Sequence, residues 1–393
     1  MTPARTFPAR RDGVRLLVVD PQAAALRSTH MADLPALLAP GDLLVVNDAA
    51  TLPASLQGRD EDGHAVEARL LAHVADNRFR AVLLGAGDWR QRTEDRPPPP
   101  AIAPGQMLHF CGLSARVAAR SQLSARMVDL EFDVCGAALW AALYREARPV
   151  QYSYVADALP LWAVQTVYAA RPWAFEMPSA GRPLSWEILL AMRRRGVGWA
   201  AVTHAAGLSA VGDAEIDAAL PLAERFEIPP ATVDAVAATR RGGGRVIAVG
   251  TTVVRALEGA FECWGALRAS AGETALRLGP GYRRRVVDGL LTGVHEPGES
   301  HFALLGAFAP PLLLAAAATQ ASREGYRTHE FGDAMLVVPG ALGGLRAASP
   351  GTAGDWPAAR EGTALHTVQF AQHRFAEPGQ RAGRPRSQGT LRA

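Results

Sequence analysis

The sequence predicts an α/β fold with a mixed, barrel-like sheet and a small all-β domain inserted into it. From Gln151 onward, helical and strand patterns alternate, which is typical of a sheet covered by helices. Between residues 65 and 132, short strand-like runs follow one another directly, separated by turn residues. We therefore assign residues 1–58 and 150–340 to the α/β domain and residues 59–149 to the inserted β domain.

The individual elements follow from the spacing of apolar residues and from the Gly and Pro residues that bound them. The predicted strands are residues 15–20, 43–47, 65–71, 79–84, 107–110, 127–132, 197–203, 246–249 and 335–338. The predicted helices are residues 137–145, 184–195, 231–241 and 301–318. Residues 58–63 are polar and interrupt the strand pattern, and the Gly-, Ala-, Pro- and Arg-rich residues 341–393 are expected to be a disordered tail.

Composition excludes several classes of protein. No apolar run is long enough to span a bilayer, and residues 1–12 lack the apolar segment of a signal peptide, so we expect a cytoplasmic protein without membrane contact. Cys111, Cys135 and Cys263 are odd in number and widely spaced, which indicates reduced thiols rather than disulfides or a zinc site.

Charge leaves nucleic acid binding open. All 41 basic residues are Arg, but the net charge is only +3, so RNA would have to bind local patches. Candidates for phosphate contacts are the Arg clusters at residues 193–195, 240–241 and 283–285. Each cluster is also compatible with a solvated face or the last turn of a helix.

Residues 245–258 are the most informative segment. A β-branched run ends at Gly250, and Thr251 or Thr252 can cap a helix that starts at Val253. Free backbone N–H groups and the positive end of the helix dipole would converge there, next to Arg255, and favour an anion. From these residues alone, an ordinary strand–helix crossover with a Thr cap explains the pattern as well.

The segment Gly-Arg-Val-Ile-Ala-Val-Gly-Thr-Thr, followed by Arg-Ala-Leu-Glu, resembles the signature of the S-adenosylmethionine:tRNA ribosyltransferase-isomerases, the QueA family of queuosine biosynthesis. Further family motifs follow in the family's order, from about residue 16 to residue 338. They are residues 41–48, 165–169, 178–181, 224–228, 280–282, 287–292, His295 with Pro297, and residues 332–335. The resemblance implies the same α/β fold with an inserted β domain.

The resemblance also implies a reaction. The family moves the ribosyl group of S-adenosylmethionine onto a 7-aminomethyl-7-deazaguanine base in the anticodon region of tRNA, which gives epoxyqueuosine and releases adenine and methionine. This chemistry needs a general base, an acid near the adenine, a clamp for the methionine carboxylate and a pocket for the base. It needs no metal, and we expect none.

Candidate residues follow from the matched motifs. The catalytic candidates are His295, His204, Glu224 and Asp333. The candidates for binding S-adenosylmethionine are Gly250, Thr251, Thr252, Arg255, Glu258, Asn47 and Asp48, with Glu258 expected to orient Arg255. The candidates for the acceptor base are Gln165, Tyr168, Ser179 and Gly181. Structural roles stay open for both histidines, for Tyr168 as a core residue, for Glu258 in a surface ion pair, and for Asn47, Asp48 and Asp333 in turns.

Several family positions carry other residues here. Ala49-Ala50 and Ala54-Ser55 stand where the family has Thr-Arg and Ala-Arg, and Gly298-Glu299 stands where it has Lys-Ser. Two hypotheses follow. In the first, replacements rebuild a working ribosyltransferase site; these are Arg182, Glu296, Glu299, His301 and His329. In the second, the chain is a paralogue that binds another nucleoside or RNA partner without this reaction. Either a monomer or a homodimer is compatible with the sequence.

Overall fold

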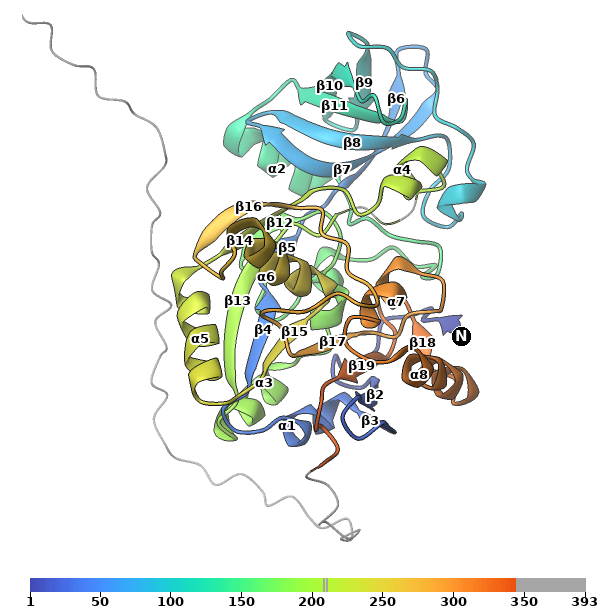
Figure 1. The fold of residues 1–393 in the computed structure, drawn as a ribbon. Helices are drawn as coiled ribbons and strands as arrows, with labels where there is room; N and C mark the ends of the chain where they lie inside the picture. Colours follow the sequence, from blue (N-terminus) through green and yellow to red (C-terminus); the bar gives the residue numbers. More distant parts are fainter. Residues whose placement is uncertain (208, 210, 344–393) are drawn as a thin grey trace, which may run out of the picture. The chain divides into compact units, whose positions relative to one another are not determined.

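The computed structural model describes residues 1–207, 209 and 211–343 (Figure 1). A nine-stranded mixed sheet forms the centre of the α/β part, in the strand order β16-β14-β13-β4-β15-β17-β19-β2-β3. The strands are β2 (Arg15–Asp20), β3 (Ala25–His30), β4 (Leu43–Asn47), β13 (Gly198–His204), β14 (Glu224–Ile228), β15 (Val246–Val249), β16 (Ser270–Thr274), β17 (Gly289–Gly293) and β19 (Ala334–Val337). The predicted α/β class with a mixed sheet is confirmed.

The four central strands are parallel, and this sets where functional residues gather. Leu44 of β4 pairs with Trp199 of β13 on one side and with Ile247 of β15 on the other, and β17 continues the parallel set. Their carboxyl ends therefore share one edge of the sheet. Strands β14 and β19 are antiparallel to their neighbours β13 and β17, so their first residues lie at the same edge.

Helices cover both faces of the sheet because side chains alternate along each strand. Residues Leu17 and Val45 belong to the core beneath α5 (Pro230–Arg241), α6 (Thr251–Trp264), α7 (Ser300–Leu305) and α8 (Pro311–Arg323). Their neighbours Leu16 and Leu44 belong to the opposite core, with α1 (Leu34–Leu37) and α3 (Trp186–Arg194). Two short pairs complete this part: β1 (Thr2–Pro3) with β18 (Arg327–Thr328), and β5 (Ala49–Thr51) with β12 (Arg171–Ala174).

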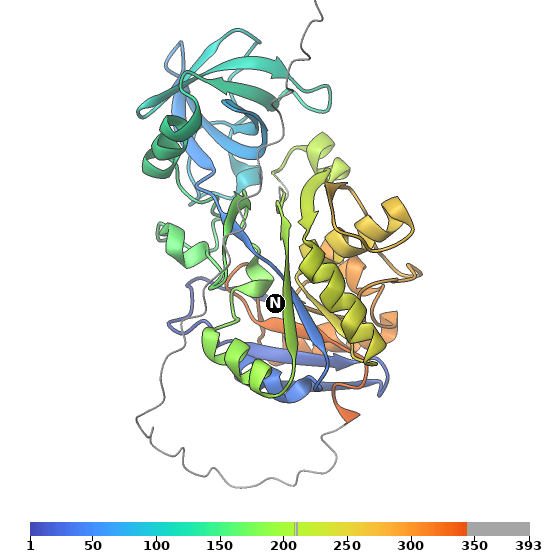
Figure 2. The same ribbon diagram turned by 90° about the vertical axis from the view of Figure 1, so that its left-hand side faces the viewer.

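Six antiparallel strands form a closed barrel in the order β10-β11-β8-β7-β6-β9 (Figure 2). They are β6 (Ser55–Asp60), β7 (Ala65–Ala75), β8 (Arg78–Leu84), β9 (Met107–Phe110), β10 (Leu113–Arg120) and β11 (Met127–Phe132). The barrel has its own core, which includes residues of α2 (Gly136–Glu146). The chain enters and leaves it side by side: the Ser55 and Arg148 backbones exchange N–H···O bonds of 2.8 and 2.9 Å.

The segment after β13 packs against this barrel. It contains α4 (Ala214–Ala219), and its Val211 and Ile216 share a small core with the barrel residues Val82, Leu84 and Met127. The hydroxyl of Ser124 donates to the Asp213 carboxylate at 2.8 Å. The loop that begins at the sheet edge therefore ends on the barrel.

Three local predictions were wrong. Residues 301–318 do not form one helix: α7 ends at Leu305, residues 306–308 form a turn, and α8 begins at Pro311, since proline fits the first turn of a helix but not its interior. Strand β6 includes residues 58–60, which were predicted to interrupt the pattern. Helix α6 begins at Thr251 with Gly250 as its N-cap, instead of at Val253 with a Thr cap.

The predicted domain boundaries stay a prediction, and the expected tail lies outside the described residues from 344 onward. Within the described part of the chain, every helix is too short or too polar to cross a bilayer.

Candidate active site at the carboxyl edge of the sheet

Three charged or titratable side chains meet at the carboxyl edge. His204 ends β13, Glu224 begins β14, and Arg255 lies in the second turn of α6. The Arg255 Nη1 atom lies 2.8 Å from Glu224 Oε2, and His204 Nε2 lies 3.3 Å from the same oxygen. The Gly207 amide donates to Glu224 Oε1 at 2.7 Å. All three side chains are buried, so the parallel strands and the first residue of β14 build a shielded acid–base group.

Burial controls the ionisation of this group. It raises the pKa of Glu224 to about 7, against the Arg255 charge and the Gly207 amide, which both lower it. Burial also lowers the pKa of His204 to about 3, with a further contribution from the Arg255 charge. At neutral pH the imidazole is therefore uncharged, while the carboxyl group is close to half ionised. A group with a pKa near the working pH is well suited to proton transfer.

The polar atoms of this group keep hydrogen-bonding capacity. The close contacts to Glu224 Oε2 lack hydrogen-bond alignment, and both ring nitrogens of His204 and the Nε atom of Arg255 have no hydrogen-bond partner among the described residues. Buried donors and acceptors in proteins are normally paired. The group therefore holds unsatisfied donors and acceptors in a shielded position, which is unusual for a purely structural contact.

The N-terminus of α6 lies at the same edge. Gly250 is its N-cap with φ +90°, and no side chain caps the helix. A side chain at position 250 would be strained by this φ and would place its Cβ 3.4 Å from the Ala180 Cβ. The turn η4 (Ser179–Gly181) therefore lies against Gly250, at the start of α6. The first backbone amides of a helix attract anions.

Other predicted residues hold the edge together through backbone contacts. The Asn47 amide group donates to the His204 carbonyl and accepts from the His204 amide, both at 2.9 Å. Asp48 accepts from the Thr203 hydroxyl at 2.6 Å, and burial raises the pKa of Asp48. Asp333 accepts from the amides of Arg15 and Arg327 at 2.8 and 2.9 Å. The Asn47 and Asp48 contacts fix the end of β13, which carries His204, whereas Asp333 joins the starts of β2 and β18.

The predicted base-binding residues Gln165 and Tyr168 have intramolecular partners. Gln165 accepts from the Thr51 amide at 2.9 Å and donates to the Thr51 carbonyl at 2.8 Å. The buried Tyr168 ring lies edge-on to Trp199, with ring centroids 5.8 Å apart. A Cβ at Gly181 would lie 2.1 Å from the Tyr168 hydroxyl, so the glycine makes room for the phenol.

Glu258 does not orient Arg255, which corrects that prediction. Its carboxylate is fully buried and accepts from the amides of Arg285, Val286 and Val287 at 2.9, 3.0 and 2.9 Å. Glu258 therefore holds the loop before β17, and the carboxylate beside Arg255 is that of Glu224.

His295 follows β17 at the same edge. Its Nε2 atom lies 3.0 Å from the Thr292 hydroxyl, its Nδ1 atom lies 3.7 Å from Glu299, and its ring stacks on His301 with centroids 5.0 Å apart. The side chain is one-fifth exposed. Its position permits contact with a ligand at the edge, separately from the buried group around Glu224.

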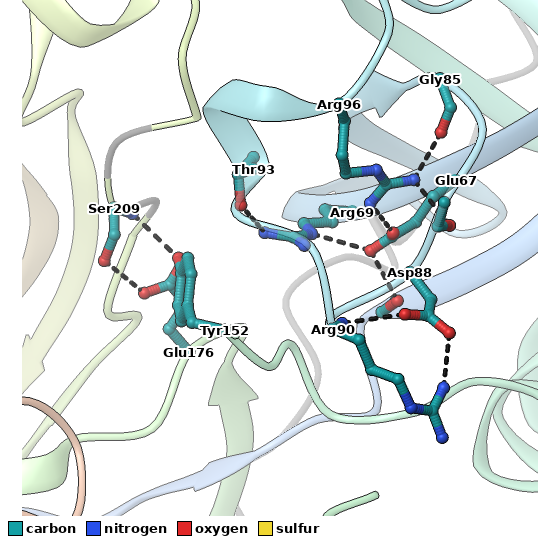
Figure 3. A network of polar contacts seen from close by, with 12 residues as sticks. Glu67, Arg69, Gly85, Asp88, Arg90, Thr93, Arg96, Tyr152, Glu176 and Ser209 are labelled. Carbon is teal, nitrogen blue, oxygen red and sulfur yellow. Dashed lines mark hydrogen bonds and ion pairs between the residues drawn. The ribbon is translucent and has the colours of Figure 1, made fainter. Parts of the chain in front are cut away.

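A second polar network was not predicted from the sequence (Figure 3). It includes Tyr152, Glu176 and Ser209, and a barrel cluster in which Glu67 pairs with Arg69 at 2.8 Å and with Arg96. Glu67 and Arg69 are almost completely buried. The signal that points to this network is the pair of charged residues inside the apolar run of β7, since buried charges are rare unless they are paired.

Among the described residues, one group has the spacing of metal ligands: Asp60, Asp62 and His64, whose ligand atoms lie within 4.8 Å of one another. Asp60 accepts from the amides of Asp62 and His64 at 3.1 and 2.8 Å, and the His64 ring lies 3.0 Å from Asp60 Oδ2. These are the contacts of a tight turn between β6 and β7.

Fold and site together define an α/β protein with a six-stranded barrel and a buried acid–base group at the carboxyl edge of parallel strands, where ligands of such sheets commonly bind. Residues 2–337 match the family model described as queuosine biosynthesis protein. The chain therefore belongs to the S-adenosylmethionine:tRNA ribosyltransferase-isomerase family, and the resemblance seen in its motifs is confirmed.

Named relatives give the same result. The S-adenosylmethionine:tRNA ribosyltransferase-isomerase of Acidithiobacillus ferrooxidans is 39% identical over 333 residues, which cover 84% of this chain and 92% of that protein. That of Gloeobacter violaceus is 36% identical over 343 residues, with 84% and 91% covered. A crystal structure of S-adenosylmethionine tRNA ribosyltransferase from Thermotoga maritima aligns with a TM-score of 0.47 and 23% identity, covering 86% of this chain and 96% of that one.

Proposed function

We propose that this protein transfers the ribosyl group of S-adenosylmethionine to 7-aminomethyl-7-deazaguanine in the anticodon region of tRNA, forming epoxyqueuosine and releasing adenine and methionine. Membership of the family supports this reaction. The observation in the structure that carries it is the buried carboxyl group of Glu224, with its pKa near 7 and its contacts to His204 and Arg255.

The reaction begins with removal of a proton from the ribose carbon that the sulfonium acidifies. We assign this step to the Glu224 carboxylate, which is substantially ionised at neutral pH and can take up the proton. His204 is uncharged at neutral pH because its pKa is about 3, so we do not assign it the role of proton donor. Its unpaired ring nitrogens can instead form hydrogen bonds. His295 is a second candidate for proton transfer, for example to the departing adenine, because its ring is accessible from the same edge.

We assign the methionine carboxylate to the N-terminus of α6 and to Arg255. The first amides of α6 have no side-chain cap and attract an anion, with Thr251 and Thr252 beside them. Arg255 contacts Glu224 through Nη1 and leaves its buried Nε without a partner among the described residues, so it can also donate to a carboxylate. We propose Gly250, Asn47 and Asp48, which lie at the same edge of the sheet, as further residues of the donor site.

The acceptor base would lie near η4, which adjoins the same helix end. Ser179 and Gly181 are part of that turn. The Tyr168 hydroxyl packs against Gly181, and Gln165 binds the Thr51 backbone of β5. For the tRNA backbone, we propose the exposed Arg283 and Arg285. Arg284 between them points inward and donates to the carbonyls of Val287, Asp288 and Ala307, each at 2.8 Å. We place the protein in the cytoplasm, as a monomer or homodimer.

The proposal is tested with purified protein, S-adenosylmethionine and tRNA that carries the 7-aminomethyl-7-deazaguanine precursor. We expect calorimetric binding of S-adenosylmethionine and release of adenine in step with modification of the base. Replacing Glu224 by Gln removes the titrating carboxyl group but keeps its size, and we expect the rate to fall about 100-fold or more. The exposed Glu273 on the neighbouring strand β16 provides a control, since Glu273→Ala leaves the buried group intact.

Two outcomes would contradict the proposal. Binding of S-adenosylmethionine without adenine release would show a paralogue that uses another acceptor. Absence of binding would show that the fold has lost its donor site and serves a different nucleoside or RNA partner.

A further inference from the structure

The carboxylate of Glu176, just after β12, joins three segments that are distant in sequence (Figure 3). The Tyr152 hydroxyl donates to Oε1 at 2.5 Å. The Ser209 amide donates to Oε1 at 3.1 Å, and the Ser209 hydroxyl donates to Oε2 at 2.7 Å. Both carboxylate oxygens are therefore occupied, and Glu176 fixes the position of Ser209.

Ser209 lies in the loop that leads from β13 to α4, and the same loop carries Gly207. The Gly207 amide donates to Glu224 Oε1 at 2.7 Å. A Cβ at Gly207 would lie 2.6 Å from that oxygen, so the backbone approaches Glu224 as closely as a glycine permits. Gly207 and Ser209 are two residues apart, and two residues of chain span at most about 7 Å. The bonds that hold Ser209 therefore limit how far the Gly207 amide can move away from the Glu224 carboxylate.

The barrel contacts this loop directly at one place and indirectly, through Tyr152 and Glu176, at another. Further along the loop, Asp213 is bound by the Ser124 hydroxyl, as described for the fold. On the side of Glu176, the Tyr152 ring centroid lies 5.4 Å from the guanidinium carbon of Arg69 in the buried charged cluster of β7. The loop is therefore anchored to groups that do not themselves belong to the site.

We propose that Glu176 is a positioning residue for Glu224: it anchors Ser209 and thereby keeps the Gly207 amide on the Glu224 carboxylate. The inference rests on the proposed function, since it assigns Glu224 to proton transfer. It adds a role for a residue that does not reach the reacting atoms, and it ties the ionisation of the site to the barrel.

Two effects of Glu176 on Glu224 have opposite signs. The Gly207 amide, which Glu176 holds in place, stabilises the ionised carboxylate and lowers the pKa of Glu224. The negative charge of Glu176 raises the same pKa, and this effect is weaker than that of the amide. The other charged or titratable groups around Glu224 are His204 on β13 and Arg255 on α6, with Arg277 acting on Arg255. None of these is changed by substitution at position 176.

The opposite signs allow a sharp test with two variants. Glu176→Gln removes the charge but keeps the length and an acceptor oxygen for Ser209, so we expect the pKa of Glu224 to fall below that of the wild type. Glu176→Ala removes the anchor, so the amide bond to Glu224 is lost and we expect the pKa to rise. A rise by one pH unit lowers the ionised fraction at pH 7 about fivefold, and activity recovers near pH 9.

The readout is the carboxyl ¹³C NMR titration of Glu224 in the full chain, assigned by comparison with Glu224→Gln, together with the pH profile of adenine release. A fall of the pKa in both variants would show that Glu176 acts through its charge alone and would overturn the proposal, as would no change in either. Glu273→Ala serves as control and is expected to leave the titration unchanged. Because the NMR titration needs no substrate, failure of the proposed reaction is distinguishable from failure of this inference.

Discussion

Glu258 of α6 offers the strongest test of how the loop before β17 is held. Its buried carboxylate accepts three backbone amides, and two of them, those of Val286 and Val287, belong to buried residues. Glu258→Ala leaves these donors unpaired, while the amide of the exposed Arg285 can bind water. A buried donor without a partner costs about 1–3 kcal/mol. The two together predict a loss of about 2–6 kcal/mol in the free energy of unfolding.

The assay is urea unfolding of the purified chain, followed by circular dichroism. Glu262 supplies a matched control: it lies one turn further along α6, is exposed, and accepts only the Tyr282 hydroxyl at 3.0 Å. We expect Glu262→Ala to change the free energy of unfolding by less than about 0.5 kcal/mol. If Glu258→Ala is no more destabilising than Glu262→Ala, the three amide bonds do not stabilise the loop and the reasoning is refuted.

Four further outcomes are expected. Gly250→Ala forces a Cβ into a backbone conformation with φ +90° and ψ 153°, which glycine alone adopts readily, so it should destabilise the protein by about 1–3 kcal/mol, and an unchanged melting temperature would contradict this. Adenine release should rise with pH through about 7 as Glu224 loses its proton, and a flat profile would exclude Glu224 as the base. Arg255→Ala should weaken the binding of S-adenosylmethionine, measured by calorimetry, about tenfold or more. It should also raise the pKa of Glu224, because the Arg255 charge lowers that pKa. An affinity equal to that of the wild type would show that Arg255 does not belong to the donor site. The affinity for tRNA should fall steeply with salt, with a smaller slope in Arg283→Ala; binding independent of salt would argue against phosphate contacts.

Much of the fold could be predicted from local sequence. Strands β2, β4, β9, β11 and β15 have the predicted bounds, because each is an apolar or alternating run that ends at a turn residue or a change of pattern. Strand β6 was missed because its Gly58, Arg59 and Asp60 resemble a turn, and only pairing with β7 and β9 reveals a barrel strand. The division between α7 and α8 was available in the sequence, since Pro310 and Pro311 cannot continue a helix.

The site could be predicted only in part. Family motifs pointed to His204, Glu224 and Arg255 one by one, but their contact depends on β14 running antiparallel beside β13 and on α6 packing beneath both. Local spacing suggested that Arg255 pairs with Glu258, three residues further along the helix. The fold instead turns Glu258 toward the backbone of the next loop. Glu176 was missed because its partners lie 24 and 33 residues away.

The backbone bridge between Ser55 and Arg148 has a topological consequence. Since the two crossing points of the barrel are neighbours, the strands that flank them still pair: β5 runs parallel to β12, with an irregularity between Pro172 and Ala174, although more than a hundred residues separate the two strands in the chain. A segment whose ends meet in this way can change in length without moving the strands that flank it. The pairing of β5 with β12 is therefore independent of the length of the chain between them, whereas the carboxyl edge stays linked to the barrel through the loop that carries Ser209 and Asp213.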